Sequence, residues 1–231
     1  MISIFIPIRK GSKRIKNKNF KSLPKFRFGL TELKIRQLEK LKTSLKKEIS
    51  QPFEFIVSTD SEKIIKYLEK YKWISVKKRS RSLATDDSLD KLIKYVPDVC
   101  KGKFILWTHV TSPLFQHSDY IEFIKTFLKK YKKNKIKSAF SANKIQKFLF
   151  RKRDKKWLSH NRAKKKWPRT QDLEDCYEVN SAAFISTREV YLKQKDRLCD
   201  NPLPIISKNN SGFDIDFMED FNYLKEKLKK I

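Results

Sequence analysis

The sequence predicts an α/β fold in which a mostly parallel sheet is flanked by helices. Short runs rich in Ile, Val and Phe alternate with segments whose apolar residues recur at helical spacing, as in strand–helix–strand units. The 231 residues suit one domain, with room for a small insertion. Hydrophobic residues make up 39% of the chain, which is enough for a packed core. We therefore expect a single domain over residues 1–231.

The elements follow in order along the chain. Each expected strand is a short β-branched or aromatic run, and these runs are 2–6, 53–57, 73–76, 103–107 and 138–142. Each expected helix carries an apolar stripe, and these stripes cover 30–49, 62–71, 89–96 and 121–131. We expect the third helix to end before Pro97, because proline interrupts helical hydrogen bonding.

Residues 145–180 interrupt this alternation. They contain the basic runs 151–156 and 162–166 together with aromatic residues such as Trp157 and Trp167. We expect an inserted hairpin or arm here. A strand at 182–185 and a closing helix at 218–228 then resume the pattern.

The net charge of +29 favours polyanionic partners. Lysine is nevertheless spread along the whole chain, as a genome-wide compositional bias would also produce, and both explanations stay open. The three scattered cysteines form no CxxC pair, so we expect a reducing compartment without a disulfide framework or a zinc site. No apolar run approaches the roughly 20 residues of a membrane span. We expect a cytoplasmic protein with no membrane partner.

The loop after the first strand predicts an anion site. Six of the residues from 9 to 18 are Lys or Arg, and they surround Gly11 and Ser12. Glycine lets backbone N–H groups approach an anion, and the cations offset phosphate charge. The loop does not match GxxxxGK[ST], so it is not a Walker A loop. Without other signals, a solvated basic turn would explain it equally well.

A second loop, near the end of the chain, carries Asp214 and Asp216 just after Gly212. Carboxylates at i and i+2 of an extended segment face the same way and can approach one hard cation. A solvated turn is the common alternative for such a pair. Together with a cationic loop, however, the pair supplies what a metal–triphosphate site requires.

A third group lies at 167–172 and 177–182. Arg169 can bind a carboxylate through two hydrogen bonds, and Gln171 and Asn180 can donate to hydroxyls or amides. The arginines of this region, Arg162 included, also suit a solvated basic arm.

Taken together, these segments resemble the CMP-acylneuraminate synthetase family, relatives of the CMP-Kdo synthetases. Seven sequence segments of the family occur here in order: P-A-R-x-G-S-K…K-N, V-S-T-D, R-x-x-x-L-A-x-D, T-S-P, R-x-Q-D, Y-x-x-N-x-A and D-I-D-x-x-E-D. They begin at Pro7, Val57, Arg79, Thr111, Arg169, Tyr177 and Asp214, and the third includes Asp86. The matches run from residue 2 to residue 220.

The resemblance implies a Rossmann-like nucleotidyltransferase sheet that binds CTP under the first loop and transfers CMP to an acidic sugar, a nonulosonate-type 2-keto-3-deoxy acid. The nucleotide-binding residues it implies are Arg9, Gly11, Ser12, Lys13, Lys18, Asn19, Arg79, Ser82 and His109. Asp214 and Asp216 are the implied Mg²⁺ ligands, and Arg9, Lys18 and Asp216 the catalytic residues. Arg162, Arg169, Gln171 and Asn180 are the implied sugar-binding residues. Residues 145–180 resemble the family's dimerisation arm, which predicts a homodimer.

Three positions depart from the family pattern. His109 stands where Gln is usual, Ile8 replaces Ala, and Ser181 replaces Gly. His109 makes the acceptor uncertain, so Kdo and phosphonate acceptors remain alternatives. A basic nucleic-acid-binding module is the alternative from another class, because Trp157 and Trp167 could stack on bases. It leaves the Asp214–Asp216 segment unexplained, and we therefore expect no nucleic-acid partner.

Overall fold

The computed structural model describes residues 1–84 and 89–230. Within this part of the chain, a seven-stranded sheet has the order β3-β2-β1-β4-β8-β5-β9. The strands are β1 (Ile2–Ile8), β2 (Phe53–Thr59), β3 (Ile74–Lys78), β4 (Phe104–Thr108), β5 (Ser138–Ile145), β8 (Cys176–Thr187) and β9 (Leu203–Ile206). β8 runs antiparallel to both of its neighbours, and the other pairings are parallel. The predicted mostly parallel α/β sheet is thus confirmed.

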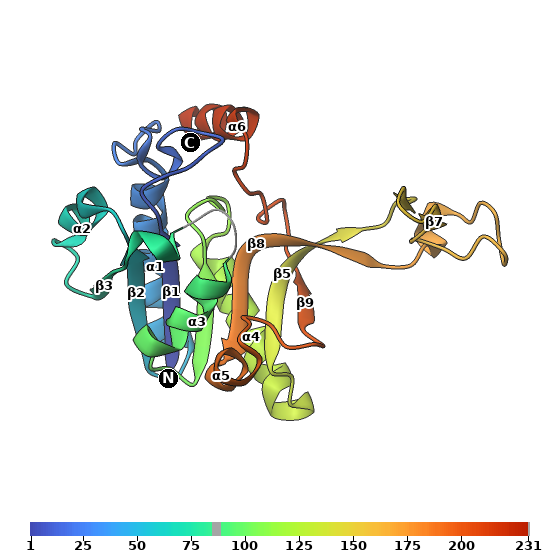
Figure 1. Cartoon of the computed structure of the whole chain (residues 1–231), viewed down its shortest axis with the longest axis horizontal. Helices are drawn as coiled ribbons and strands as arrows, with labels where there is room; N and C mark the ends of the chain where they lie inside the picture. The colour runs from blue at the N-terminus through green and yellow to red at the C-terminus, as the bar shows by residue number, and fades with distance from the viewer. Residues whose placement is uncertain (85–88, 231) are drawn as a thin grey trace.

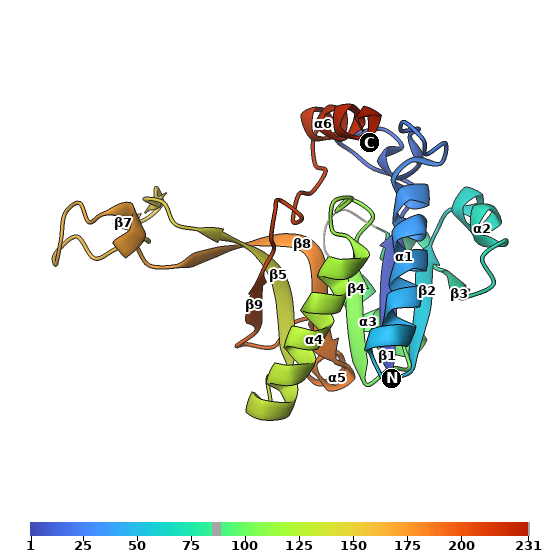
Figure 2. The ribbon, with the colours of Figure 1, turned by 180° about the vertical axis from the view of Figure 1, so that it is seen from behind.

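Helices cover both faces of the sheet. α1 (Gly29–Glu48) and α4 (His117–Asn134) lie on one face, and α3 (Asp90–Val99) and α5 (Arg188–Gln194) lie on the other (Figures 1 and 2). α2 (Glu62–Leu68) follows β2 near the edge of the sheet. α6 (Met218–Lys229) lies beyond the strand ends, beside the loop that follows β1 (Figure 1). Among the described residues, no helix combines the length and the apolar composition needed to cross a membrane.

The alternation of β1 explains the two-sided core. Ile2, Ile4, Ile6 and Ile8 share a buried cluster with apolar residues of α1 and α4. Phe5 points to the opposite face, where its cluster includes residues of α3 and α5. Side chains two apart on a strand share a face, so the strand is apolar on both sides, as buried parallel strands are.

The third helix does not end before Pro97. α3 continues to Val99 and includes that proline. Arg188 stabilises this last turn, because its guanidinium donates to the carbonyl oxygens of Pro97 at 2.8 Å and Cys100 at 3.2 Å. These bonds satisfy carbonyls that have no partner within the helix. A contact 91 residues away thus overrides the local signal to stop.

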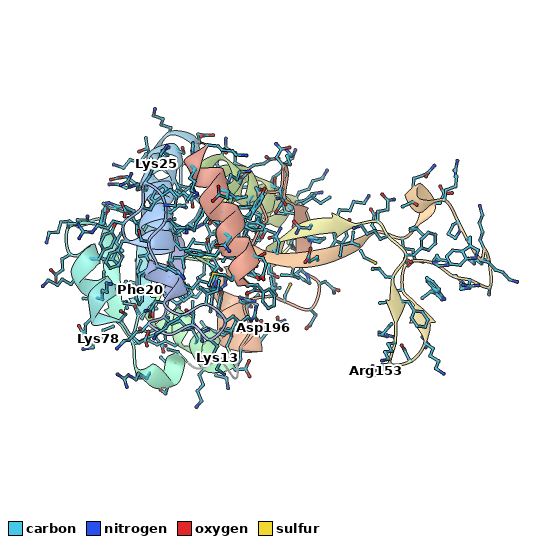
Figure 3. The ribbon with its side chains drawn as sticks, turned by 90° about the horizontal axis from the view of Figure 1, so that it is seen from above. Lys13, Phe20, Lys25, Lys78, Arg153 and Asp196 are labelled. Atoms are coloured by element: carbon cyan, nitrogen blue, oxygen red, sulfur yellow. The ribbon has the colours of Figure 1, made fainter. Side chains whose placement is uncertain are left out.

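The interruption at 145–180 is a projecting arm. β5 and β8 continue beyond the body of the sheet and carry the small hairpin of β6 (Phe150–Arg151) and β7 (Lys156–Trp157) and the 3₁₀ turn η3 (Thr170–Asp172) (Figures 1 and 3). The arm has its own aromatic cluster, in which Trp157 and Trp167 lie 5.6 Å apart between ring centroids. In Figure 3, Arg153 marks the arm and Lys13 the first loop on the body. The two basic regions are therefore well separated within one chain.

Candidate active site

A cavity of about 430 Å³ opens beside the carboxyl ends of β1 and β4. Ligands of open α/β sheets bind in this position. Its lining residues come from several loops and from α3: Pro7, Arg9, Ser12, Lys18, Asn19, Arg79, Leu83, Ala84, Leu89, Leu92, Trp107, His109, Val110 and Thr111. Six of the predicted nucleotide-binding residues are among them. Gly11, Lys13 and Ser82 are not, although Leu83 and Ala84, directly after Ser82, are.

Hydrogen bonds within the first loop give it a defined shape. The Ser12 hydroxyl donates to the Ile15 carbonyl oxygen at 2.7 Å and accepts from the Lys18 N–H at 3.0 Å. The Asn19 amide donates to the Arg9 carbonyl oxygen at 2.9 Å. Ser12 and Asn19 therefore organise the loop backbone, and Arg9 and Lys18 bring positive charge to the cavity wall.

Lys18 connects this loop to the acidic segment near the end of the chain. Its amine donates to the Ile215 carbonyl oxygen and lies 3.9 Å from an oxygen of Asp216. Burial lowers the pKa of Lys18, while the charges of Asp214 and Asp216 raise it. The cationic loop and the carboxylate pair, nearly two hundred residues apart in sequence, therefore meet at one place.

Backbone contacts orient the two carboxylates. Ile215 is buried in the core, and its N–H donates to the Thr111 carbonyl oxygen at 2.9 Å. The Asp220 carboxylate accepts from the N–H groups of Asp216 at 2.9 Å and Phe217 at 2.7 Å. This carboxylate lies in the first turn of α6, where negative charge is stabilising. Asp220 thereby fixes the backbone that carries Asp216.

Asp214 has an unusual environment. Burial raises the pKa of Asp214 and the charge of Asp216 raises it further, whereas a hydrogen bond with Thr111 and the charge of Lys18 lower it. The half-exposed Asp216 also pairs with Arg14, whose guanidinium nitrogen lies 2.7 Å from a carboxylate oxygen. Repulsion between two close carboxylates is relieved by a cation.

The carboxylate pair fits Mg²⁺ in its chemistry. Mg²⁺ prefers oxygen ligands, keeps several waters, and is commonly held by one or two carboxylates plus substrate phosphates. Over residues 1–84 and 89–230, no cluster of three or more His, Cys, Asp or Glu side chains forms a larger metal site. Asp214 and Asp216 are thus a suitable pair for an ion shared with a phosphate ligand.

Arg79 also lines the cavity. It is buried, and its guanidinium donates to the Ser58 carbonyl oxygen at 3.0 Å. Its Nε atom has no hydrogen-bond partner among the described residues, and burial lowers the pKa of Arg79. The guanidinium therefore keeps one buried donor without a partner among the described residues. Asp86, part of the same family segment, lies outside the described residues.

His109 is held by Trp107. The indole N–H of Trp107 donates to Nε2 of His109 at 2.9 Å, so the proton of the neutral ring belongs on Nδ1. Burial, then the charges of Arg197, Lys34 and Lys18, lower the pKa of His109 to about 3. The Arg197 guanidinium lies over the Phe184 ring, 3.7 Å from its centroid. The cavity wall thus contains a neutral imidazole in one tautomer.

The predicted sugar-binding residues of the arm do not line this cavity. Arg162 stacks over Trp157 and Trp167, at 5.4 and 5.2 Å from the ring centroids. Arg169 makes two hydrogen bonds to Asp172, at 2.9 and 3.1 Å. Gln171, in the same turn η3, accepts from the Gln146 amide through its backbone oxygen. Within one chain, the arm that carries these residues lies apart from the loop that follows β1 (Figure 3).

Asn180 lies in a buried polar network. Its amide oxygen accepts from Ser141 at 2.6 Å, and its nitrogen donates to Asn143 at 2.9 Å and Ser207 at 2.8 Å. Gly212 packs directly against it, because an added Cβ would lie 2.1 Å from the Asn180 nitrogen. Asn180 therefore connects the start of β8 to the segment that leads to Asp214.

Sequence reasoning missed several residues of the site. Trp107, Val110 and Thr111 line the cavity from the end of β4, and their place after a buried strand was the available signal. Leu89 and Leu92 line it from the start of α3. Their helical spacing indicated only a core position, so no sequence signal separated the two roles.

Comparison with known proteins identifies the family of the chain. Residues 3–229 match the sequence model of the family described as "Cytidylyltransferase". The chain is 27% identical over 234 residues to the post-translational flagellin modification protein B of Campylobacter coli, covering 96% of this chain and 92% of that protein. It is also 27% identical over 221 residues to the N-acylneuraminate cytidylyltransferase of Streptococcus agalactiae, covering 94% of this chain. It spans about half (50%) of that streptococcal relative.

Solved structures resemble the fold at low sequence identity. The CMP:2-keto-3-deoxy-manno-octonic acid synthetase, solved as a complex with CTP, aligns with a TM-score of 0.63 at 12% identity. The alignment covers 99% of this chain and 98% of that one. The family match, which covers nearly the whole chain, carries the assignment: this protein belongs to the cytidylyltransferase family of nucleotidyltransferase enzymes.

Proposed function

We propose that this cytidylyltransferase joins CTP to the anomeric hydroxyl of an acidic 2-keto-3-deoxy sugar of the nonulosonate type and releases pyrophosphate. The observation that carries the proposal is the meeting of Lys18 with the Asp214–Asp216 segment beside the cavity. A cationic loop and a carboxylate pair in one crevice suit a nucleoside triphosphate with its divalent cation.

The nucleotide would lie along the cavity. Arg9, Ser12, Lys18 and Asn19 line the cavity, and Lys18 contacts the acidic segment, which suits the triphosphate. Lys13 and Gly11 belong to the same loop. Arg79 and the residues after Ser82 also line the cavity, and we assign cytosine to them. Leu83 and Leu92 supply apolar surface there for the base.

Transfer requires no protein nucleophile. The sugar hydroxyl attacks the α-phosphorus in line and loses its proton to solvent, the bond to the bridging oxygen breaks, and pyrophosphate leaves. Arg9 and Lys18 stabilise the charge on the leaving group. Asp214 and Asp216 would hold Mg²⁺, which supplies electrostatic stabilisation of the phosphate oxygens. Asp220 keeps the backbone of Asp216 in place.

Two observations support an acidic sugar as acceptor. The streptococcal relative is named for N-acylneuraminate, and the structural neighbour for 2-keto-3-deoxy-manno-octonic acid. The arm also presents Arg162, Arg169 and Gln171, whose donors suit a carboxylate and hydroxyls. Kdo and phosphonate acceptors remain the nearest alternatives, because small changes in a pocket decide acceptor choice.

The arm further supports a homodimer in which each arm reaches the partner's cavity. Phe150, Trp167 and Val179 expose apolar side chains on or near it, as surfaces that bind another chain do. Arg162, Arg169 and Gln171 would then complete the partner's sugar site. We also propose a cytoplasmic location, consistent with the free thiols of Cys100, Cys176 and Cys199.

The direct test is pyrophosphate release from CTP with Mg²⁺ and a panel of 2-keto-3-deoxy sugar acids, with UTP, ATP and GTP as nucleotide controls. Turnover with a nonulosonate and CTP is expected, and none with any acid would overturn the proposal. Asp216→Ala should abolish turnover without unfolding the protein. The exposed Asp98, on α3, provides the matched control Asp98→Ala, which should keep full activity.

A further inference from the structure

A lysine lies in the core directly behind the acidic segment. Lys34, on α1, has a relative accessibility of 0%. A buried amine is costly unless hydrogen bonds compensate for lost water. Its Nζ atom lies 2.9 Å from two acceptors, the Ser112 carbonyl oxygen and the Tyr120 hydroxyl. An apolar side chain could fill this position without the free-energy cost of burying an amine. The presence of a lysine here therefore suggests a role beyond packing.

Lys34 is not the only side chain of α1 that bonds the turn at residues 111–113. Gln37, one helical turn further along α1, donates its amide N–H to the Pro113 carbonyl oxygen at 2.6 Å. Tyr120, the second partner of Lys34, bonds in turn to Thr108 at the end of β4. Two side chains of α1 therefore hold consecutive carbonyls of the turn 111–113, which follows β4.

The other side of the same turn holds the acidic segment. The Thr111 carbonyl oxygen accepts from the Ile215 N–H at 2.9 Å, and the Thr111 side chain bonds Asp214. The Ser112 hydroxyl lies 3.5 Å from a carboxylate oxygen of Asp214. The turn thus connects two groups of residues. Lys34 and Gln37 bond to its carbonyl oxygens from α1, and Asp214 contacts its side chains from the acidic segment.

We propose that Lys34 is a positioning residue for Asp214: by holding the turn 111–113 from behind, it sets the orientation in which Asp214 binds the divalent cation. This inference rests on the proposed role of Asp214 as a cation ligand. Groups that orient a ligand govern metal affinity strongly although they never touch the metal. The position of Lys34 inside the core agrees with this role, because an anchor must be rigid.

The test is Mn²⁺ binding in the presence of CTP, followed by the EPR signal of the free ion against CTP alone, in wild type and in Lys34→Met. We expect affinity to fall about tenfold in Lys34→Met. Lys34→Gln should recover part of the loss, because its amide can still donate to the Ser112 carbonyl oxygen. Lys40→Met, on an exposed position of the same helix, is the matched control and should bind as wild type does.

Gln37→Met provides a second variant, which keeps the test decisive if Lys34→Met does not fold. It removes the neighbouring anchor without changing charge, so it should weaken Mn²⁺ binding in the same direction and by a smaller factor. Below about pH 7, where Lys34 is protonated, a purely electrostatic effect would differ, because removing its positive charge would tighten cation binding. Unchanged or tighter binding in the folded variants would overturn the positioning role.

The outcomes also separate this inference from the proposed function. Wild-type binding that disappears in Asp214→Asn supports Asp214 as a ligand, whatever the sugar. No Mn²⁺ binding by wild type with CTP, beyond the binding by CTP alone, would refute the cation site itself. Normal wild-type binding together with unaltered binding in Lys34→Met and Gln37→Met would refute only the role of Lys34.

Discussion

The indole N–H of Trp107 donates a hydrogen bond to Nε2 of His109 at 2.9 Å, and both rings line the cavity. This single contact determines which nitrogen of His109 carries the proton. The Nδ1–H group is the remaining donor of the ring, so a substrate oxygen or nitrogen in the cavity is its natural acceptor. His109 can therefore replace the amide donor of the Gln that the family resemblance leads us to expect at this position.

We predict that His109→Gln keeps most of the activity, whereas His109→Phe lowers kcat/KM about five- to tenfold through loss of one hydrogen bond. Kinetics with CTP and the best acceptor of the panel measure both effects. Equal activity of the Phe and Gln variants would show that the donor is not used.

His109 should also leave no mark on the pH profile. Its pKa is lowered to about 3, so the ring is neutral at every pH above that value and gains a proton only as the pH falls through it. The acid limbs of kcat/KM against pH should coincide for wild type and His109→Gln. A limb near the ordinary histidine pKa of about 6.5 that vanishes in the variant would contradict the assigned state.

Asp220→Ala should weaken the site without contacting the substrate. The change removes the acceptor of the Asp216 and Phe217 N–H groups, so we expect turnover about tenfold lower and unfolding free energy about 1 kcal/mol lower. Pyrophosphate release and thermal unfolding measure the two effects. Glu219→Ala, at the exposed neighbouring position, should change neither.

The proposed homodimer, in which each arm completes the partner's site, predicts complementation between two inactive variants. Asp216→Ala damages the body of the enzyme and Arg162→Ala its arm, so a mixed dimer contains one undamaged site out of two. Random mixing after dissociation should restore about a quarter of wild-type activity. A mixture no more active than the average of its parts would mean that each chain uses its own arm or none.

Lys34 predicts a pH dependence of stability. Burial lowers its pKa from 10.5 to about 7, and the charge of Asp214 opposes this shift. Between these values the folded state holds Lys34 neutral while the unfolded state is still protonated. The unfolded state then binds more protons, so the stability contributed by this site rises with pH.

Comparison of urea unfolding at neutral and alkaline pH for wild type and Lys34→Met checks this sign. The difference in unfolding free energy, wild type minus variant, should increase as pH rises from about 7 to 10. The groups facing Lys34 are the Tyr120 hydroxyl and, through charge, Asp214. A difference that falls with pH would contradict the buried state of the amine.

Gly212→Ala should be destabilising, because its Cβ would lie 2.1 Å from the Asn180 amide nitrogen and 2.6 Å from Asn143 Oδ1. Overpacking of this kind costs about 1–3 kcal/mol, which denaturant unfolding can measure. Gly11→Ala is the control for glycine loss, because a Cβ there would meet nothing within 4 Å. Similar losses in both variants would argue against the contact with Asn180.

Periodicity was sufficient to locate most elements and the main loops. The alternation at Ile2–Ile8 and the apolar stripe of α1 are local properties of the chain, so they can be read without coordinates. Loops after parallel strands gather at one edge, and Arg9, Ser12 and Lys18 accordingly lie around one cavity. Their roles toward CTP, and those of the arm residues toward a sugar, stay predictions.

Contacts between distant segments could not be read in this way. Several features depend on contacts with distant residues. They are the antiparallel direction of β8, the continuation of α3 past Pro97, and the short elements α5 and β9. Nothing in the sequence distinguished Lys34 from a surface residue, because a lysine on a helix is normally solvated. Its burial, and the internal hydrogen bonds of Asn180, follow from how α1, the turn 111–113 and the acidic segment pack together. Local pattern therefore established the kind of fold and where a ligand would bind, while long-range packing established which polar groups face the cavity and which hold it in shape.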